Sequence, residues 1–195
     1  QDARPAPMPD AGRQPDRYSF SEVTRLRRDP YAVYARRVLR LDPLDPFNAD
    51  PGAADRGNIY HEIVQRFVAA EIDPRGAAAE AALVEIVHQV FEERALPAHV
   101  DAVWRSRALE MARRFLEWER NRRPLVAWSK VEQSAHMQVT NMLAVTGRAD
   151  RIDIRTDGRA DIIDYKTGAA PSAKVARTLL DPQLALEAAV LKGGG

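Results

Sequence analysis

The stretch Ile162-Ile163-Asp164-Tyr165-Lys166-Thr167-Gly168 places an acid and a lysine two residues apart at the end of an apolar run. Side chains two residues apart in a β-strand point to the same face, so we expect Asp164 and Lys166 to lie side by side. Charged groups at a strand end cost stability unless a partner compensates them. A divalent cation with a phosphate is such a partner, which predicts metal-assisted hydrolysis of a phosphodiester.

A second acid, Asp150, belongs to the strand-like segment 142–154 upstream. The Asp-Gly pair at 157–158 predicts a hairpin that would bring Asp150 close to Asp164 and Lys166. An Asp-x-Lys triplet alone is typical of a solvated strand end, whereas two acids and a lysine that converge from adjacent strands favour a catalytic site. Two further acids stand at odd-numbered steps from these and are expected to face away from the site: Asp153 and Asp161.

The pattern of apolar residues predicts an α/β protein. Residues 1–16, rich in Pro, Asp and Arg, are expected to form a disordered linker. Residues 17–195 are expected to form a single domain, with a mainly helical part over 17–124 and a sheet core with its following helix over 125–195. The expected helices start at the capping box Ser19–Glu22 and at Pro30, cover 55–70, 77–94 and 98–121, and run from Asp181-Pro182 to Gly193.

The composition excludes several classes of protein. The net charge is +1, 45% of the residues are hydrophobic and there is no cysteine, which excludes disulfides. No apolar run is long enough for a membrane span, and the start carries no signal-peptide pattern, so we expect a cytoplasmic protein. Because the chain begins at Gln1 and ends in Gly193-Gly194-Gly195 straight after a helix pattern, we expect a domain excised from a longer polypeptide. The arginine-rich run 105–130 is either a solvated helix face or a phosphate-contacting stripe, and the sequence leaves both open.

Six short motifs follow one another along the chain: 18–23, 29–34, Gly57–Glu62, Gly147–Asp153, Ile163–Gly168 and Asp181–Leu184. In this order they resemble the RecB-like branch of the PD-(D/E)XK nuclease superfamily. Within that branch the motif sequences are most similar to those of the C-terminal nuclease domain of AddB-type subunits of bacterial AddAB helicase–nucleases. The resemblance covers roughly residues 17–192 and implies a restriction-endonuclease-like mixed sheet flanked by helices.

The resemblance also implies roles for particular residues. The metal ligands would be the carboxylates of Asp150 and Asp164 and the backbone carbonyl of Tyr165, with His61 beside the metal. Lys166 would position water or stabilise the transition state. The remaining candidates are an acid on the first core strand and a glutamine near the DNA: Glu132 and Gln183.

The implied activity is that of a Mg²⁺-dependent exonuclease, with Mn²⁺ as a possible substitute, in double-strand break repair in the bacterial cytoplasm. Its expected partners are a single DNA strand delivered by a helicase, an AddA-like helicase–nuclease subunit and the rest of a longer AddB-like chain. The alternative is a catalytically silent nuclease fold that serves as a DNA-binding or docking scaffold. The sequence carries no Walker motif, so we expect no ATPase in this chain.

Two positions depart from the branch's pattern. Glu187 stands where many relatives have a tyrosine, and Asp29 stands where relatives with an iron–sulfur cluster have a cysteine. Because such clusters need thiolates, we expect no iron–sulfur cluster here. Apolar packing is expected to hold the segment 18–41 instead, through Phe20, Val23, Leu26, Tyr31, Tyr34 and Leu39.

Overall fold

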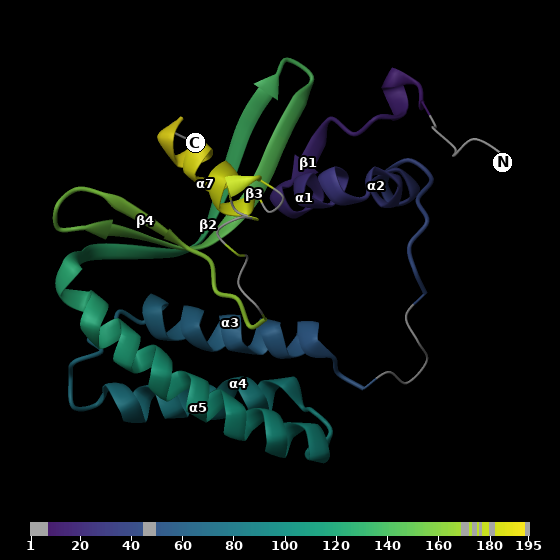
Figure 1. Cartoon of the computed structure of the whole chain (residues 1–195). Helices are drawn as coiled ribbons and strands as arrows, with labels where there is room; N and C mark the ends of the chain where they lie inside the picture. The colour runs from purple at the N-terminus through teal and green to yellow at the C-terminus, as the bar shows by residue number, and fades with distance from the viewer. Residues whose placement is uncertain are drawn as a thin grey trace. The chain divides into compact units, whose positions relative to one another are not determined.

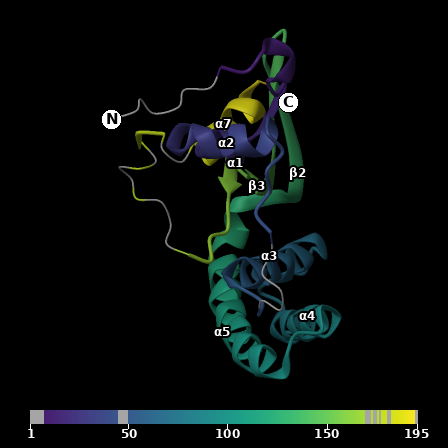
Figure 2. The same ribbon diagram turned by 90° about the vertical axis from the view of Figure 1, so that its right-hand side faces the viewer.

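The computed structural model describes residues 8–44, 50–168, 172, 175, 177–179 and 182–193 (Figures 1 and 2). By their contacts the residues fall into two compact units. The first unit draws on Gln1–Asp45, Ser134–Arg148 and Pro171–Gly195, and the second on Pro46–Gln133 and Ala149–Ala170. In the part of the chain described, no helix is both long and apolar enough to cross a bilayer.

The first unit opens with the 3-10 helix η1 (Ala11–Arg13), the strand β1 (Arg17–Ser19) and the helices α1 (Phe20–Arg28) and α2 (Pro30–Arg37). The capping box predicted at Ser19–Glu22 is confirmed: the Ser19 hydroxyl accepts from the Glu22 N–H at 3.1 Å, and the Glu22 carboxylate accepts from the Ser19 N–H at 2.9 Å. Asp29 caps α2, because its carboxylate accepts from the Ala32 N–H at 3.1 Å.

The second unit begins with three helices, α3 (Ala53–Ala69), α4 (Ala79–Arg94) and α5 (Ala98–Arg122), which pack on one another (Figure 1). Their apolar faces form the main core of this unit. Ile59, Ile63 and Phe67 of α3 are buried against it, as the helical stripe in the sequence predicts. The short 3-10 helix η2 (Arg123–Leu125) follows α5 and leads into the sheet.

The described residues form a four-stranded mixed sheet, which confirms the predicted α/β class. The long strands β2 (Val126–Thr140) and β3 (Leu143–Arg155) are neighbours, β1 pairs in parallel with β3, and β4 (Ala160–Ile163) pairs antiparallel with β3. The predicted Asp-Gly hairpin turn joins β3 to β4, and Gly158 has a φ of +82°, a conformation that suits glycine.

In the first unit, Phe20 packs with Val145 of β3 and Val190 of the last helix, α7 (Gln183–Lys192). Phe20 lies so close to β3 that a Cβ atom on Gly147 would stand 1.9 Å from its Cδ2 atom. The lack of a side chain at position 147 is therefore what admits the aromatic ring to the sheet surface.

Four expectations need correction or a limit. The strand β4 ends at Ile163, so Asp164 and Lys166 follow it and are not part of it. The helix expected from residue 55 begins two residues earlier, at Ala53. Residues 1–7 of the expected linker and Asp181 lie outside the described residues. Three side chains expected to pack the N-terminal segment are exposed instead: Leu26 on α1, Tyr31 on α2, and Leu39 just after α2.

Candidate active site

The site is centred on the Asp150 carboxylate in the second unit. Its Oδ2 atom accepts a hydrogen bond from the Tyr165 N–H at 2.8 Å and lies 3.4 Å from Nδ1 of His61. Asp150 comes from β3, His61 from the middle of α3 and Tyr165 from the segment after β4. Three segments that are far apart in the sequence thus meet at one carboxylate.

Asp164 and Lys166 form the second part of the site. The Lys166 Nζ atom lies 2.9 Å from Oδ1 and 2.8 Å from Oδ2 of Asp164, so the two side chains are paired as predicted although they lie beyond the strand. The side chain of Asp164 is only 8% exposed, whereas that of Lys166 is 38% exposed. The lysine is therefore the member of the pair that an incoming phosphate would reach.

The Asp150–His61 pair and the Asp164–Lys166 pair influence each other's ionisation. The hydrogen bond to Asp150 raises the pKa of His61 against the opposing effect of burial, and the charge of Asp164 adds to the rise. Burial acts to raise the pKa of Asp150, but the hydrogen bonds from His61 and the Tyr165 backbone, together with the charge of Lys166, outweigh burial and lower it. An ionised Asp150 beside a readily protonated His61 is the state favoured by this arrangement.

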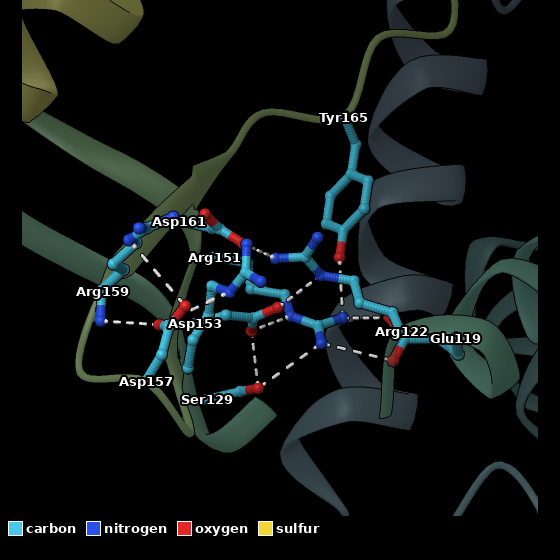
Figure 3. A network of polar contacts seen from close by, with 10 residues as sticks. Glu119, Arg122, Ser129, Arg151, Asp153, Asp157, Arg159, Asp161 and Tyr165 are labelled. Atoms are coloured by element: carbon cyan, nitrogen blue, oxygen red, sulfur yellow. Dashed lines mark hydrogen bonds and ion pairs between the residues drawn. The ribbon is translucent and has the colours of Figure 1, made fainter. Parts of the chain in front are cut away.

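Tyr165 is held in place by its side chain. The ring makes edge contacts with His61 and Phe115, each with centroids 6.2 Å apart, and the hydroxyl accepts from Nη1 of Arg151 at 3.2 Å (Figure 3). Burial raises the pKa of Tyr165 to about 12, so the hydroxyl stays protonated at neutral pH. Anchoring the ring fixes the backbone between Asp164 and Lys166, the segment that also hydrogen-bonds to Asp150.

A network of buried charges supports this anchor (Figure 3). Arg151, which is 2% exposed, pairs with Glu119 of α5 and donates from Nε to Asp153 at 2.5 Å. Asp153 is fully buried and also accepts from Ser129 at 2.6 Å and from Arg122 at 2.8 Å. Arg122 also donates to the carboxylate of Asp161 at 2.6 Å, which extends the network to β4.

Sequence reasoning assigned no role to Arg151 or Glu119. The available signal was the alternation of β3, which places Arg151 and Asp153 on one face and Asp150 on the other. The predicted orientation of Asp153 and Asp161 agrees with their contacts, since both are engaged by Arg122 in the network.

Gly57 allows the site to close up. A Cβ atom at this position of α3 would lie 3.3 Å from the Thr167 hydroxyl oxygen, tighter than ordinary van der Waals contact. The glycine thus lets the segment after β4 approach α3 within one turn of His61.

Two further candidates, Glu132 and Gln183, are also among the described residues. Glu132 is half-buried in β2 and has a φ of +52°, in the left-handed region that non-glycine residues rarely adopt. Gln183 is the first residue of α7 in the first unit, and its amide donates to Glu187 at 3.1 Å. The metal-ligand role of Glu132 and the DNA-contact role of Gln183 stay predictions.

The donor set suits a hard cation. Mg²⁺ binds oxygen ligands, and the candidates here are the carboxylates of Asp150 and Asp164 and the backbone carbonyl of Tyr165. Among the described residues no three His, Asp or Glu side chains converge as a ready metal cluster. Asp164 is instead paired with Lys166, and Asp150 with His61. A cation held by these residues would take the place of such charge pairs.

Arginines of the run 105–130 are largely engaged within the protein. Arg105 pairs with Asp101 at 2.8 Å, Arg114 with Glu110 at 2.5 Å, and Arg122 with the buried network. Two others donate to backbone carbonyls, Arg120 to Pro74 and Arg123 to Val126. The solvated-face and phosphate-stripe interpretations therefore both need revision, because part of the run has a structural role.

Comparisons with known proteins identify the family of the chain. Residues 17–195 match the family model of the PD-(D/E)XK nuclease superfamily. Similar curated proteins include uncharacterized proteins of Rickettsia bellii (24% identical over 184 residues), Rickettsia typhi (25% over 189) and Rickettsia conorii (26% over 188). Each alignment covers 93% of this chain but only 22% of the relative, so the chain spans about a fifth of the length of these relatives.

The family match covers nearly the whole chain, including His61, Asp150, Asp164 and Lys166. The mixed sheet with flanking helices agrees with that family's fold. The chain belongs to the PD-(D/E)XK nuclease superfamily.

Proposed function

We propose that this chain is a metal-dependent deoxyribonuclease domain that hydrolyses phosphodiester bonds at the Asp150–Asp164–Lys166 site. The observation that carries the proposal is the hydrogen bond of 2.8 Å from the Tyr165 N–H to Asp150, which brings the Asp150–His61 pair beside the Asp164–Lys166 pair. Acid, lysine and histidine side chains close enough to shift one another's ionisation are common at catalytic sites. The family membership favours nuclease chemistry over other uses of the same groups.

Each group has a defined task in this proposal. Asp150, Asp164 and the Tyr165 carbonyl would hold Mg²⁺, for which Mn²⁺ can substitute. When bound, the cation supplies charge neutralisation at the phosphate and lowers the pKa of water. Lys166 stabilises the charge that develops on the phosphate oxygens, and it is exposed enough to meet them. His61 keeps Asp150 oriented and ionised through the contact to Oδ2.

The finer assignment is an exonuclease in a helicase–nuclease complex that acts in double-strand break repair. The order of the motifs supports an AddB-like subunit with an AddA-like helicase–nuclease partner, which would deliver single-stranded DNA to the site. The competing proposal is a scaffold that binds DNA without cleaving it. All the residues required for chemistry are present, so the catalytic role is favoured.

The test is cleavage of linear single-stranded DNA by the full-length protein with Mg²⁺. Asp164→Ala and Lys166→Ala should each lower the rate by roughly 10²–10³-fold or more, because the first removes a metal ligand and the second removes a charge that stabilises the transition state. The matched controls are Asp157→Ala, at an exposed hairpin turn, and Lys130→Ala, an exposed lysine on β2. Both controls should keep the wild-type rate.

If Asp164→Ala or Lys166→Ala cleaved DNA at a rate near that of the wild type, the catalytic role assigned to that residue would be wrong. Binding of DNA by the wild-type protein with no metal-dependent cleavage, alone or with its partner subunit, would favour the scaffold. Thermal unfolding of each variant shows whether loss of activity reflects the site and not the fold.

A further inference from the structure

A cavity of about 680 Å³ opens beside the candidate active site within the second unit. One wall is the face of α3 that carries Tyr60 and His61, and a second wall is α5. The segment after β4 closes the third side with Tyr165, Lys166 and Thr167. The volume falls within the range of roughly 300–1,000 Å³ that is usual for ligand sites.

The cavity has an aromatic and apolar interior. Phe115, Met111 and Trp118 of α5 lie along it with Val64 of α3. Trp118 is 39% exposed, and its ring is tilted by 33° against that of Phe115 with centroids 6.2 Å apart. The guanidinium groups of Arg122 and Arg151 lie 5.2 and 5.8 Å from the centroid of the indole ring, and its exposed part offers a surface on which another planar ring can stack.

The rim of the cavity is mostly cationic. Arg107 and Arg114 border it on α5 and Lys166 borders it on the opposite side, with Glu110 as the acidic residue of the rim. Arg114 is paired with Glu110, whereas no ion pair of Arg107 is seen among the described residues. A ligand that is planar and apolar in one part and anionic in another would match both the interior and the rim.

We propose that the cavity receives an unpaired nucleobase next to the scissile phosphate, so that the site acts on single-stranded DNA. This inference rests on the proposed nuclease function, because Lys166, His61 and Tyr165 line the same cavity. A phosphate at Lys166 leaves its neighbouring base beside Trp118, and Arg107 meets the adjoining backbone. In a duplex the bases are stacked and paired, and extruding one of them costs free energy, so a base enters this cavity more readily from a single strand.

The binding test uses two fluorescently labelled oligonucleotides of equal length, oligo-dT and an abasic deoxyribose-phosphate strand. They are titrated onto the full-length protein without divalent metal, so that no bond is cleaved. Base–aromatic stacking contributes about 5- to 150-fold to affinity for each stacked base, and the wild-type protein should prefer oligo-dT within that range. Trp118→Ala should remove the preference by weakening oligo-dT binding only, and Trp118→Phe should keep most of it.

The matched control is Trp128→Ala. Trp128 is 49% exposed on β2 and contacts Lys130, but it lies outside this cavity. Its replacement should leave both affinities unchanged. Equal weakening of oligo-dT and abasic binding by Trp118→Ala, or loss of the preference in Trp128→Ala, would overturn the proposal.

A second measurement covers the case in which Trp118→Ala fails to fold. The chain has three tryptophans, so Trp104→Phe combined with Trp128→Phe leaves Trp118 as the reporter. Its fluorescence should be quenched by oligo-dT and not by the abasic strand. Unchanged fluorescence with saturating oligo-dT would refute stacking at Trp118. Because these assays involve no cleavage, they can fail while the catalytic assignment holds, and the reverse is also true.

Discussion

The backbone N–H of Tyr165 donates to Oδ2 of Asp150 at 2.8 Å, and the same oxygen faces Nδ1 of His61. Both contacts use Oδ2, and no contact to Oδ1 is seen among the described residues. Asp150 is thus oriented by one oxygen and presents the other for a cation. This division fits a carboxylate that serves as a ligand and is itself held by neighbouring donors.

Asp150→Asn should abolish Mn²⁺ binding, because the amide keeps the shape of the carboxylate but loses its charge. His61→Gln should leave a weaker site, with an affinity lowered by about 10- to 100-fold, since it removes only a contact that orients Asp150. Calorimetric titration of the full-length protein with Mn²⁺ measures both effects. Asp157→Asn is the control, and an Asp150→Asn variant that binds Mn²⁺ as tightly as the wild type contradicts the assignment.

The Arg151 network should dominate the stability of the second unit. Arg151→Met leaves the buried carboxylates of Glu119 and Asp153 without their shared cation, and loss of one partner of a buried pair costs about 3–5 kcal/mol. The comparison is Arg114→Met, whose pair with Glu110 is 78% and 61% exposed and contributes about 0–1 kcal/mol. Urea unfolding of both variants would show no such difference if the network were only incidental.

Local signals in the sequence predicted most of the secondary structure. The capping box at Ser19, the Asp-Gly turn at 157–158 and the stripe at Ile59, Ile63 and Phe67 all depend on residues a few positions apart. Such patterns reflect backbone geometry and one buried face, which a short window contains. Asp164 and Lys166 were expected side by side on a strand; they do pair, but in the segment beyond the end of β4.

Contacts between distant residues were not predictable in this way. Arg151 and Glu119 are 32 positions apart, and nothing in either neighbourhood indicates that they meet. The expected packing of Leu26, Tyr31 and Leu39 was wrong, because helical spacing shows which residues share a face but not whether a partner covers that face. The aromatic cavity beside Lys166 likewise depends on how α3 and α5 pack.

Phe20 and Gly147 should be strongly coupled in the first unit. Gly147→Ala places a Cβ atom 1.9 Å from Cδ2 of Phe20, so the ring has to leave its position. Phe20→Ala alone should cost about 3–5 kcal/mol through the cavity it creates. In that background Gly147→Ala should add little, and a double-mutant cycle by urea unfolding measures the coupling.

The control for this pair is Gly12→Ala, where a Cβ atom meets nothing within 4 Å. It should change the free energy of unfolding by no more than about 0.5 kcal/mol. If the costs of Phe20→Ala and Gly147→Ala simply add, the ring does not depend on the glycine and the packing described here is wrong.

Stability should depend on pH through Asp153. Burial acts to raise the pKa of this carboxyl, but the hydrogen bonds from Arg151, Ser129 and Arg122 outweigh burial and lower it. The folded-state pKa therefore lies below the unfolded value of about 3.9, so the folded protein binds fewer protons at acid pH. The stabilisation is present in full above that unfolded value and is lost as the pH falls through the folded pKa.

Asp153→Asn should accordingly flatten the fall in unfolding free energy between about pH 5 and pH 2, in addition to lowering stability at neutral pH. The measurement is a series of urea titrations across that range for the variant and the wild type. Asp42→Asn serves as the control, because its carboxylate is 66% exposed and pairs only at the surface with Arg36. If the free energy of unfolding of Asp153→Asn fell with decreasing pH as steeply as that of the wild type, other carboxylates, and not the buried network, would cause the loss of stability in acid.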